Sequence, residues 1–127
     1  MDCFREEIKV NPIVFLCVDK IETRKAIWGT IQKHCDLVID GRMLGEAMQV
    51  ITLDPRNIFD IEYYSTTLFD PSEQAEERCT GHATIYCATI AAGLMVHQFT
   101  RKLRGFCTDR HLAMNLLSSE MLCLEKF

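Results

Sequence analysis

Asp19 has a residue type and a setting that could do chemistry. It follows residues 13–18, six consecutive apolar positions that favour a short strand buried on both faces, as in a parallel sheet. Open α/β sheets bind ligands at the carboxyl ends of their strands, and a carboxylate there is suited to hold Mg²⁺ on a nucleotide. Alternatively, Asp19 caps the helix that follows, because Asp19 and Glu22 have the spacing of a capping box. The two roles are compatible.

Cys79 is the second candidate, because it alone among the seven cysteines lies in a polar setting. It precedes the start of a long apolar helix, and the neighbouring Arg78 and His82 favour a thiolate, which is the reacting species. Glu76 and Glu77 oppose that effect. Cys79 is therefore either a reactive nucleophile or an inert loop thiol, and the residues alone leave both readings open.

The remaining cysteines, histidines and arginines predict no further site. No C-x-x-C pair occurs, so no zinc is expected, and Cys17 and Cys87 lie in apolar runs where thiols behave as small hydrophobic side chains. Three histidines are isolated and lack metal-ligand spacing: His34, His97 and His111. Arg24 and Arg42 could face the same strand ends as Asp19, although solvent-exposed arginines are the default expectation.

The amino-terminal part of the sequence predicts a strand, a helix and a second strand. Residues 21–34 have the apolar spacing of an amphipathic helix, and residues 37–39 form another short apolar run that ends at Asp40-Gly41. The order strand–helix–strand is a βαβ unit, whose two strands are parallel. Apolar residues at 48–53 and 59–64, on either side of a turn, then predict two more strands that pair antiparallel.

The carboxyl-terminal part predicts a loop, a long helix and a hairpin. Residues 66–81 hold a proline, a glycine and an acidic cluster, as in a surface crossover loop. Residues 82–103 favour a helix that is apolar nearly all round, with Gly105 as its stop, and residues 112–122 indicate a terminal hairpin. Such a helix must be covered on most sides, and two parallel strands offer too little sheet. Part of the same domain, or a partner chain, is therefore expected to be missing.

Length and composition set the class of protein. A chain of 127 residues allows a single domain, residues 1–127, and a net charge of −4 argues against a nucleic-acid partner. Residues 80–100 carry no Asp, Glu, Lys or Arg, but their histidine, threonine and glutamine groups favour a buried helix over a membrane span. The first residues are acidic, so no signal peptide is indicated, and seven cysteines suggest reduced thiols. We expect a soluble cytoplasmic protein with no membrane partner.

Three stretches in the same order resemble the ThiF/MoeB/HesA family, which contains the ubiquitin-activating-like adenylating enzymes. The family's signature of a strand, an aspartate, four residues and an arginine is similar to VFLCVDKIETR at residues 14–24. Its next strand and glycine-bearing turn resemble LVIDGRMLGE at residues 37–46. Its crossover-loop cysteine, before a long helix rich in small residues, resembles RCTGH at residues 78–82. With the terminal hairpin, the resemblance covers residues 10–118.

The resemblance implies a partial Rossmann-like, ThiF-type α/β fold with a parallel βαβ unit, antiparallel strands, one long buried helix and a terminal hairpin. By it, Asp19 is the aspartate that holds Mg·ATP, and Cys79 is the candidate thioester or acyl-disulfide cysteine. Members use ATP to adenylate the carboxyl-terminal glycine of a small β-grasp protein, either ubiquitin-like or a sulfur carrier, and the domain usually dimerises. Two differences are that Lys20 replaces the usual asparagine after the aspartate, and that the paired zinc motifs are absent, as in members without zinc.

The glycine-rich G-x-G-x-x-G loop that cradles phosphate is absent from these 127 residues. The sequence therefore predicts the carboxyl-terminal part of a ThiF-like adenylating domain, inactive alone, whose partner is a second copy or the missing amino-terminal part. The alternative is a non-catalytic dimerisation or interaction module derived from that fold. A third hypothesis is an unrelated cytosolic α/β binding domain, so whether the chain is part of an enzyme stays open.

Overall fold

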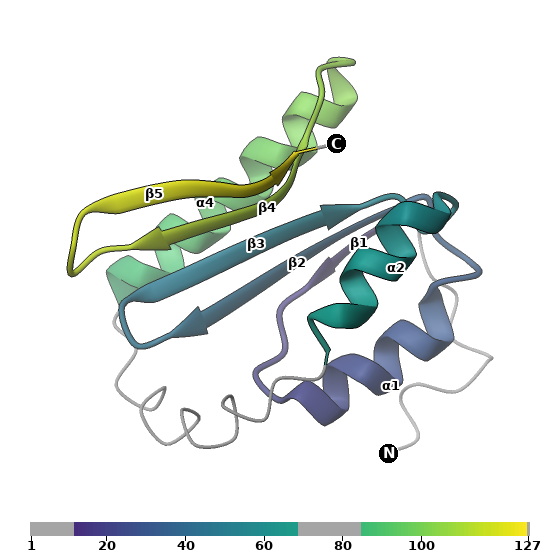
Figure 1. The fold of residues 1–127 in the computed structure, drawn as a ribbon, viewed down its shortest axis with the longest axis horizontal. Coiled ribbons are helices and arrows are strands. Elements are labelled where there is room, and N and C mark those ends of the chain that lie inside the picture. The colour runs from purple at the N-terminus through teal and green to yellow at the C-terminus, as the bar shows by residue number, and fades with distance from the viewer. Residues whose placement is uncertain (1–11, 69–84, 127) are drawn as a thin grey trace.

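The computed structural model describes residues 12–68 and 85–126, and Figure 1 shows their arrangement. The elements along the chain are β1 (Ile13–Leu16), α1 (Ile21–Ile31), β2 (Leu37–Leu44), β3 (Ala47–Leu53), α2 (Ile58–Thr66), α4 (Ile85–Leu103), β4 (Asp109–Asn115) and β5 (Glu120–Lys126). Within the described residues the fold is α/β, with a mixed five-stranded sheet and three helices.

The predicted βαβ unit is confirmed. β1 and β2 pair in parallel, with Leu16 opposite Asp40, and α1 connects them. The predicted capping box is wrong, because the cap position of α1 is Lys20, which makes no side-chain cap hydrogen bond. Glu22 therefore lies one residue short of the position from which it could reach back to the cap, and Asp19 precedes the helix altogether.

β1 lies at one edge of the sheet, whose order is β1-β2-β3-β4-β5, and the other three pairs of neighbouring strands are antiparallel. Phe15 is 41% exposed, so the prediction of a strand buried on both faces is wrong for β1. Cys17 is exposed too, against the expectation for its apolar run, whereas Cys87 is buried as expected. An edge strand has a neighbour on one side only, and the described residues place no strand beyond β1.

Residues 59–64, predicted to be a strand, lie in the helix α2. Asn57 caps α2, because its side chain accepts a hydrogen bond from the backbone N–H of Phe59. Asp60 and Tyr64, one helical turn apart, are buried, whereas Phe59 is 68% exposed. The apolar residues of this segment fit both an alternating and a helical spacing, so periodicity did not separate the two. β3 therefore pairs with β2 and β4, and not with the strand predicted at residues 59–64.

Two glycines and the terminal hairpin follow the sequence-based predictions. Leu44 of β2 pairs with Ala47 of β3 across a tight turn, in which Gly45 adopts a φ of +61° that glycine takes without strain. Gly105 follows α4 with a φ of +76°, as expected for a helix stop. β4 and β5 form the predicted antiparallel hairpin.

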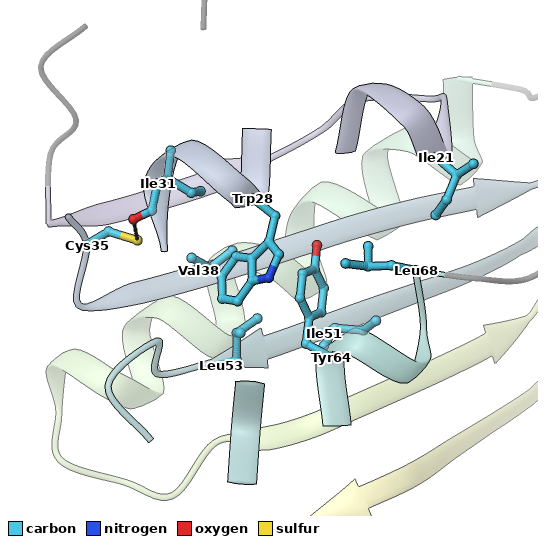
Figure 2. Packing of buried hydrophobic residues seen from close by; sticks show 9 residues of the cluster. All are labelled: Ile21, Trp28, Ile31, Cys35, Val38, Ile51, Leu53, Tyr64 and Leu68. Carbon is cyan, nitrogen blue, oxygen red and sulfur yellow. Dashed lines mark hydrogen bonds between the residues drawn. The ribbon is translucent and has the colours of Figure 1, made fainter. Parts of the chain in front are cut away.

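Helices cover both faces of the sheet (Figure 1). On the face covered by α1 and α2, the rings of Trp28 and Tyr64 meet edge to face with 4.8 Å between their centroids. The rest of this buried cluster, drawn in Figure 2, consists of Ile21, Ile31, Cys35, Val38, Ile51, Leu53 and Leu68. α4 packs on β2 and β3 from the opposite face. It approaches so closely that a β-carbon at Gly41 would lie 2.4 Å from the sulfur of Met95.

α4 buries one side only. Its buried residues are Cys87, Ala91, Met95 and Gln98. Its other side is exposed, including Ile85, Ala88, Ala92 and Val96. The expectation of cover on most sides is therefore not met by the described residues, because the sheet covers one side of a helix that is apolar on its exposed side as well. No helix in residues 12–68 and 85–126 is both long and apolar enough to cross a membrane.

Candidate functional site

A buried carboxylate, Asp40, centres a polar cluster beside the carboxyl end of β1. Asp40 lies in β2 opposite Leu16, the last residue of β1, and its side chain is 0% exposed. Arg24 of α1 donates a hydrogen bond to its Oδ1 at 3.0 Å. Arg42 donates to its Oδ2 from Nε at 3.1 Å and from Nη2 at 3.0 Å. The Tyr64 hydroxyl donates to the same oxygen at 2.7 Å. Both oxygens are satisfied, as a buried charge requires.

Arg24 also ties the turn after β1 to this cluster. Its Nη2 donates to the backbone carbonyl oxygen of Val18 and, over 3.5 Å, to that of Gly41. The side chain is 3% exposed, so the expectation that it is solvated is wrong. Because Val18 directly precedes Asp19, Arg24 fixes the backbone that carries Asp19 relative to β2.

Arg42 extends the cluster to the end of α2. Its Nη1 and Nη2 donate to the carbonyl and the hydroxyl oxygen of Thr67, both at 2.9 Å, and its side chain is 10% exposed, again against the solvated default. Burial and the neighbouring Asp40 charge raise the pKa of Tyr64, so its hydroxyl stays protonated and donates. Two arginines therefore hold one aspartate, and each of them also bonds a backbone carbonyl of another segment.

The structure places Asp19 at the predicted edge of the sheet. Asp19 is exposed beyond the carboxyl end of β1, and Cys17 is exposed in the same segment. Partial burial and the charge of Asp40 raise the pKa of Cys17, while Arg24 acts in the opposite direction. Cys17 is therefore a thiol near neutral pH. This edge of the sheet therefore carries an accessible carboxylate next to a backbone segment that Arg24 holds.

An accessible aspartate in this place fits Mg²⁺ on a nucleotide. Mg²⁺ is usually held by one or two carboxylates, with phosphates and waters completing its octahedron, so a single aspartate is sufficient. Asp19 would supply that carboxylate, and Arg24 holds the backbone directly before it. In the part of the chain that the structure describes, no group of three or more His, Cys, Asp or Glu side chains could hold a metal by itself.

Cys79, the second predicted site residue, lies outside the described residues, as does the predicted loop 66–81 beyond Leu68. Its role stays a prediction. Conversely, the sequence-based reasoning treated Asp40 only as the residue that ends a strand. The signal that could have identified it is an ionisable residue following three apolar ones in a strand, with Arg42 two positions on. A carboxylate in such a strand must find a cationic partner.

A second polar group lies on the same face of the sheet, between β3, β4 and α2. His111 Nε2 lies 2.9 Å from Gln49 Oε1, and its Nδ1 lies 2.7 Å from the Tyr63 hydroxyl. The amide oxygen can only accept, so Nε2 carries the proton and Nδ1 accepts from the hydroxyl. Burial, helped by the charge of Arg42 and opposed by Asp40, lowers the pKa of His111 to about 4. Both nitrogens of this neutral imidazole are therefore occupied.

We predict that His111 makes the chain less stable in mild acid. In the unfolded chain a histidine has a pKa of about 6.5, so between about pH 6.5 and pH 4 the unfolded state binds a proton that the folded state does not. The free energy of unfolding then falls as pH falls through this window. In His111→Gln the loss between pH 7 and pH 4.5 should be smaller by about 1–3 kcal/mol, measured by urea unfolding at both pH values. His97→Gln, on the exposed side of α4, is the control and should match the unmodified chain. An unchanged pH dependence in His111→Gln would contradict the prediction.

Comparison with known proteins gives a likeness of fold. No family model and no curated protein matches the sequence. Among solved structures, the crystal structure of PaaA is similar, with a TM-score of 0.59 and 13% sequence identity. The match covers 91% of this chain and 42% of that chain, so this chain spans less than half the length of PaaA. At this identity the likeness shows the arrangement of the elements alone.

Proposed function

We propose that this chain is the carboxyl-terminal part of an ATP-dependent adenylating domain of the ThiF type, which activates the carboxyl terminus of a small β-grasp protein. The observation that carries the proposal is that Asp19 is exposed and Arg24, five residues later, is buried. Asp19 is exposed beyond the carboxyl end of a parallel strand, whereas Arg24 is buried and holds the backbone before Asp19 onto Asp40. A carboxylate held in place at a strand end is what Mg²⁺ binding at a nucleotide requires.

The arrangement of the elements supports a Rossmann-like origin and an incomplete domain. β1 and β2 form a parallel pair. In doubly wound folds, such a pair is extended by further parallel strands. β1 offers an apolar edge at which such strands would pair, with Phe15 41% exposed. A structurally similar chain of more than twice the length fits the same proposal.

In the proposed reaction, a carboxylate oxygen of the β-grasp protein attacks the α-phosphorus of ATP, and the bond to the β-phosphate breaks to release pyrophosphate. Mg²⁺, when bound, neutralises the phosphate charge. Asp19 would hold that ion, and Arg24 and Asp40 would keep Asp19 in place. Cys79 would then accept the activated acyl group as a thioester, with AMP as the leaving group, in keeping with its predicted role.

A non-catalytic interaction module remains the second candidate function. The exposed apolar side of α4 favours it, because a surface of this kind marks a contact with another chain or another part of the same protein. The two candidates differ in one measurable property, which is the use of ATP.

The test replaces Asp19 by alanine in a protein that combines this chain with a segment carrying the glycine-rich loop, as one polypeptide or as two co-expressed parts. With a β-grasp substrate present, we expect Mg²⁺-dependent ATP–pyrophosphate exchange, and Asp19→Ala should reduce it by about 100-fold or more. Asp36→Ala, an exposed carboxylate at the opposite end of the parallel pair, is the control and should keep the exchange.

Cys79→Ala should keep the exchange and lose the thiol-sensitive conjugate, which separates the transfer step from adenylation. If Asp19→Ala keeps full exchange, the proposed role of Asp19 fails. If the unmodified combination shows no exchange with any β-grasp substrate, the interaction module is the better account.

A further inference from the structure

Lys20 follows Asp19 in the connection between β1 and α1, and both side chains are exposed. Arg24 holds the backbone on both sides of this pair. Its backbone N–H donates to the carbonyl oxygen of Lys20 at 3.0 Å, and its guanidinium donates to that of Val18. Within residues 12–68 and 85–126, neither Asp19 nor Lys20 forms an ion pair. A carboxylate and an ammonium group therefore face solvent side by side, on a backbone that is held in place.

The helix that Lys20 begins does not explain why a lysine stands there. Lys20 is the cap residue of α1, a position where Ser, Thr, Asp or Asn accepts a hydrogen bond from the first backbone N–H groups, and its side chain makes no such bond. A cation is also unfavourable near the positive end of the helix macrodipole. Its φ of −106° and ψ of 139° are those of extended backbone, so no residue type is required by the conformation. Residues that break a local rule of this kind are expected where a protein binds or reacts.

The proposed adenylation supplies a ligand of the opposite charge. The phosphates of ATP are anionic, and pyrophosphate leaves with the electron pair of the bond that joined it to the α-phosphorus, so negative charge builds up on it. An ammonium group donates charge-assisted hydrogen bonds to phosphate oxygens, and fixed cations at such a leaving group stabilise the transition state. Lys20 directly follows Asp19, so the same turn can bind the phosphates and the metal ion that accompanies them.

We infer that Lys20 binds the phosphate groups that leave as pyrophosphate, beside the Mg²⁺ that Asp19 would hold. The inference rests on the proposed function and adds a second charged group to that site. Lys20 donates its N–H groups to phosphate oxygens and transfers no proton, because attack of a carboxylate on the α-phosphorus releases none. Loss of the ammonium group therefore weakens the binding of phosphate and leaves the requirement for Mg²⁺ unchanged.

The first test measures ATP–pyrophosphate exchange in the protein completed by a segment with the glycine-rich loop. Lys20→Met removes the charge and keeps the side chain long, so the pyrophosphate concentration for half-maximal exchange should rise about tenfold or more. Lys20→Arg keeps the charge and should retain most of the affinity. Lys33→Met, which changes an exposed lysine beyond the other end of α1, is the matched control and should have no effect. The Mg²⁺ concentration for half-maximal exchange should be the same in all three variants.

The second test reads the contact without turnover. In the same protein, Mg²⁺ with inorganic pyrophosphate should slow the chemical acetylation of Lys20, followed by mass spectrometry, and leave that of Lys33 unchanged. Lys20→Asn should raise the urea midpoint of the full chain, because asparagine caps α1, and should weaken pyrophosphate binding as Lys20→Met does. A lysine with a structural role would instead lose stability when it is replaced.

Three results would overturn the inference, and they point to different errors. If Lys20→Met or Lys20→Asn exchanges pyrophosphate as Lys33→Met does, in a protein that is otherwise active, Lys20 does not contact phosphate and the proposed function stands. If Lys20→Met raises the Mg²⁺ requirement, Lys20 acts through the backbone of Asp19. If the unmodified protein shows no exchange, the proposed function and the inference fail together.

Discussion

Asp40→Asn is expected to lower the free energy of unfolding by about 3–5 kcal/mol, because breaking a buried ion pair from one side leaves the other charge uncompensated. Here two guanidinium groups lose the carboxylate that they share, with Arg24 3% exposed and Arg42 10% exposed. The amide nitrogen of asparagine would also face N–H and O–H donors where a carboxylate oxygen accepted from Arg42 and Tyr64. Urea unfolding followed by circular dichroism measures the change.

Asp36→Asn is the matched control. Asp36 lies 3.6 Å from Arg56 in an ion pair whose side chains are 56% and 65% exposed, so its loss should leave the unfolding midpoint almost unchanged. Tyr64→Phe removes one hydrogen bond to Asp40 and keeps the charges, so it should cost about 1–2 kcal/mol and rank between the two. Equal midpoints for Asp40→Asn and Asp36→Asn would mean that the cluster does not contribute to stability.

Trp28→Ala is expected to cost a similar amount, about 3–5 kcal/mol, for a different reason. Trp28 is 5% exposed and packs edge to face on Tyr64 in the cluster of Figure 2, so its loss removes apolar contacts and leaves a cavity. The cluster joins α1, α2 and the sheet, and these elements cannot close the space without moving the cluster around Asp40. The measurement is again urea unfolding by circular dichroism, because the variant lacks the only tryptophan.

Phe59→Ala tests the same loss of an aromatic ring on the same face of the protein. Phe59 is 68% exposed on α2, so its removal should shift the midpoint little. Trp28→Phe keeps part of the ring contact with Tyr64 and should fall between them. If Trp28→Ala were as stable as Phe59→Ala, residues 58–66 would not be held by this cluster.

Part of this protein could be read from its sequence, because the features concerned are local. Two apolar runs around an amphipathic segment predict a βαβ unit, and the crossover connection through an α-helix makes its two strands parallel. That topology in turn puts Asp19 at the carboxyl end of β1, whatever lies elsewhere. Gly105 ends a helix and the terminal hairpin forms for equally local reasons, which are backbone freedom and the spacing of apolar residues.

Other features were decided by the tertiary structure. Residues 58–64 suit a strand or a helix, and the helix prevails because it buries Tyr64 against Trp28 and brings its hydroxyl to Asp40. Arg24 becomes a buried partner of Asp40 because the fold brings together residues from separate elements, α1 and β2.

Composition also cannot say which side of an apolar helix faces the sheet. In the structure α4 turns Met95 to Gly41, where the missing β-carbon leaves room for the sulfur. The sequence by itself determined the βαβ unit, the terminal hairpin and the place of Asp19. Only long-range packing decided which charges are buried and which apolar faces stay open, because burial depends on neighbours that are distant along the chain.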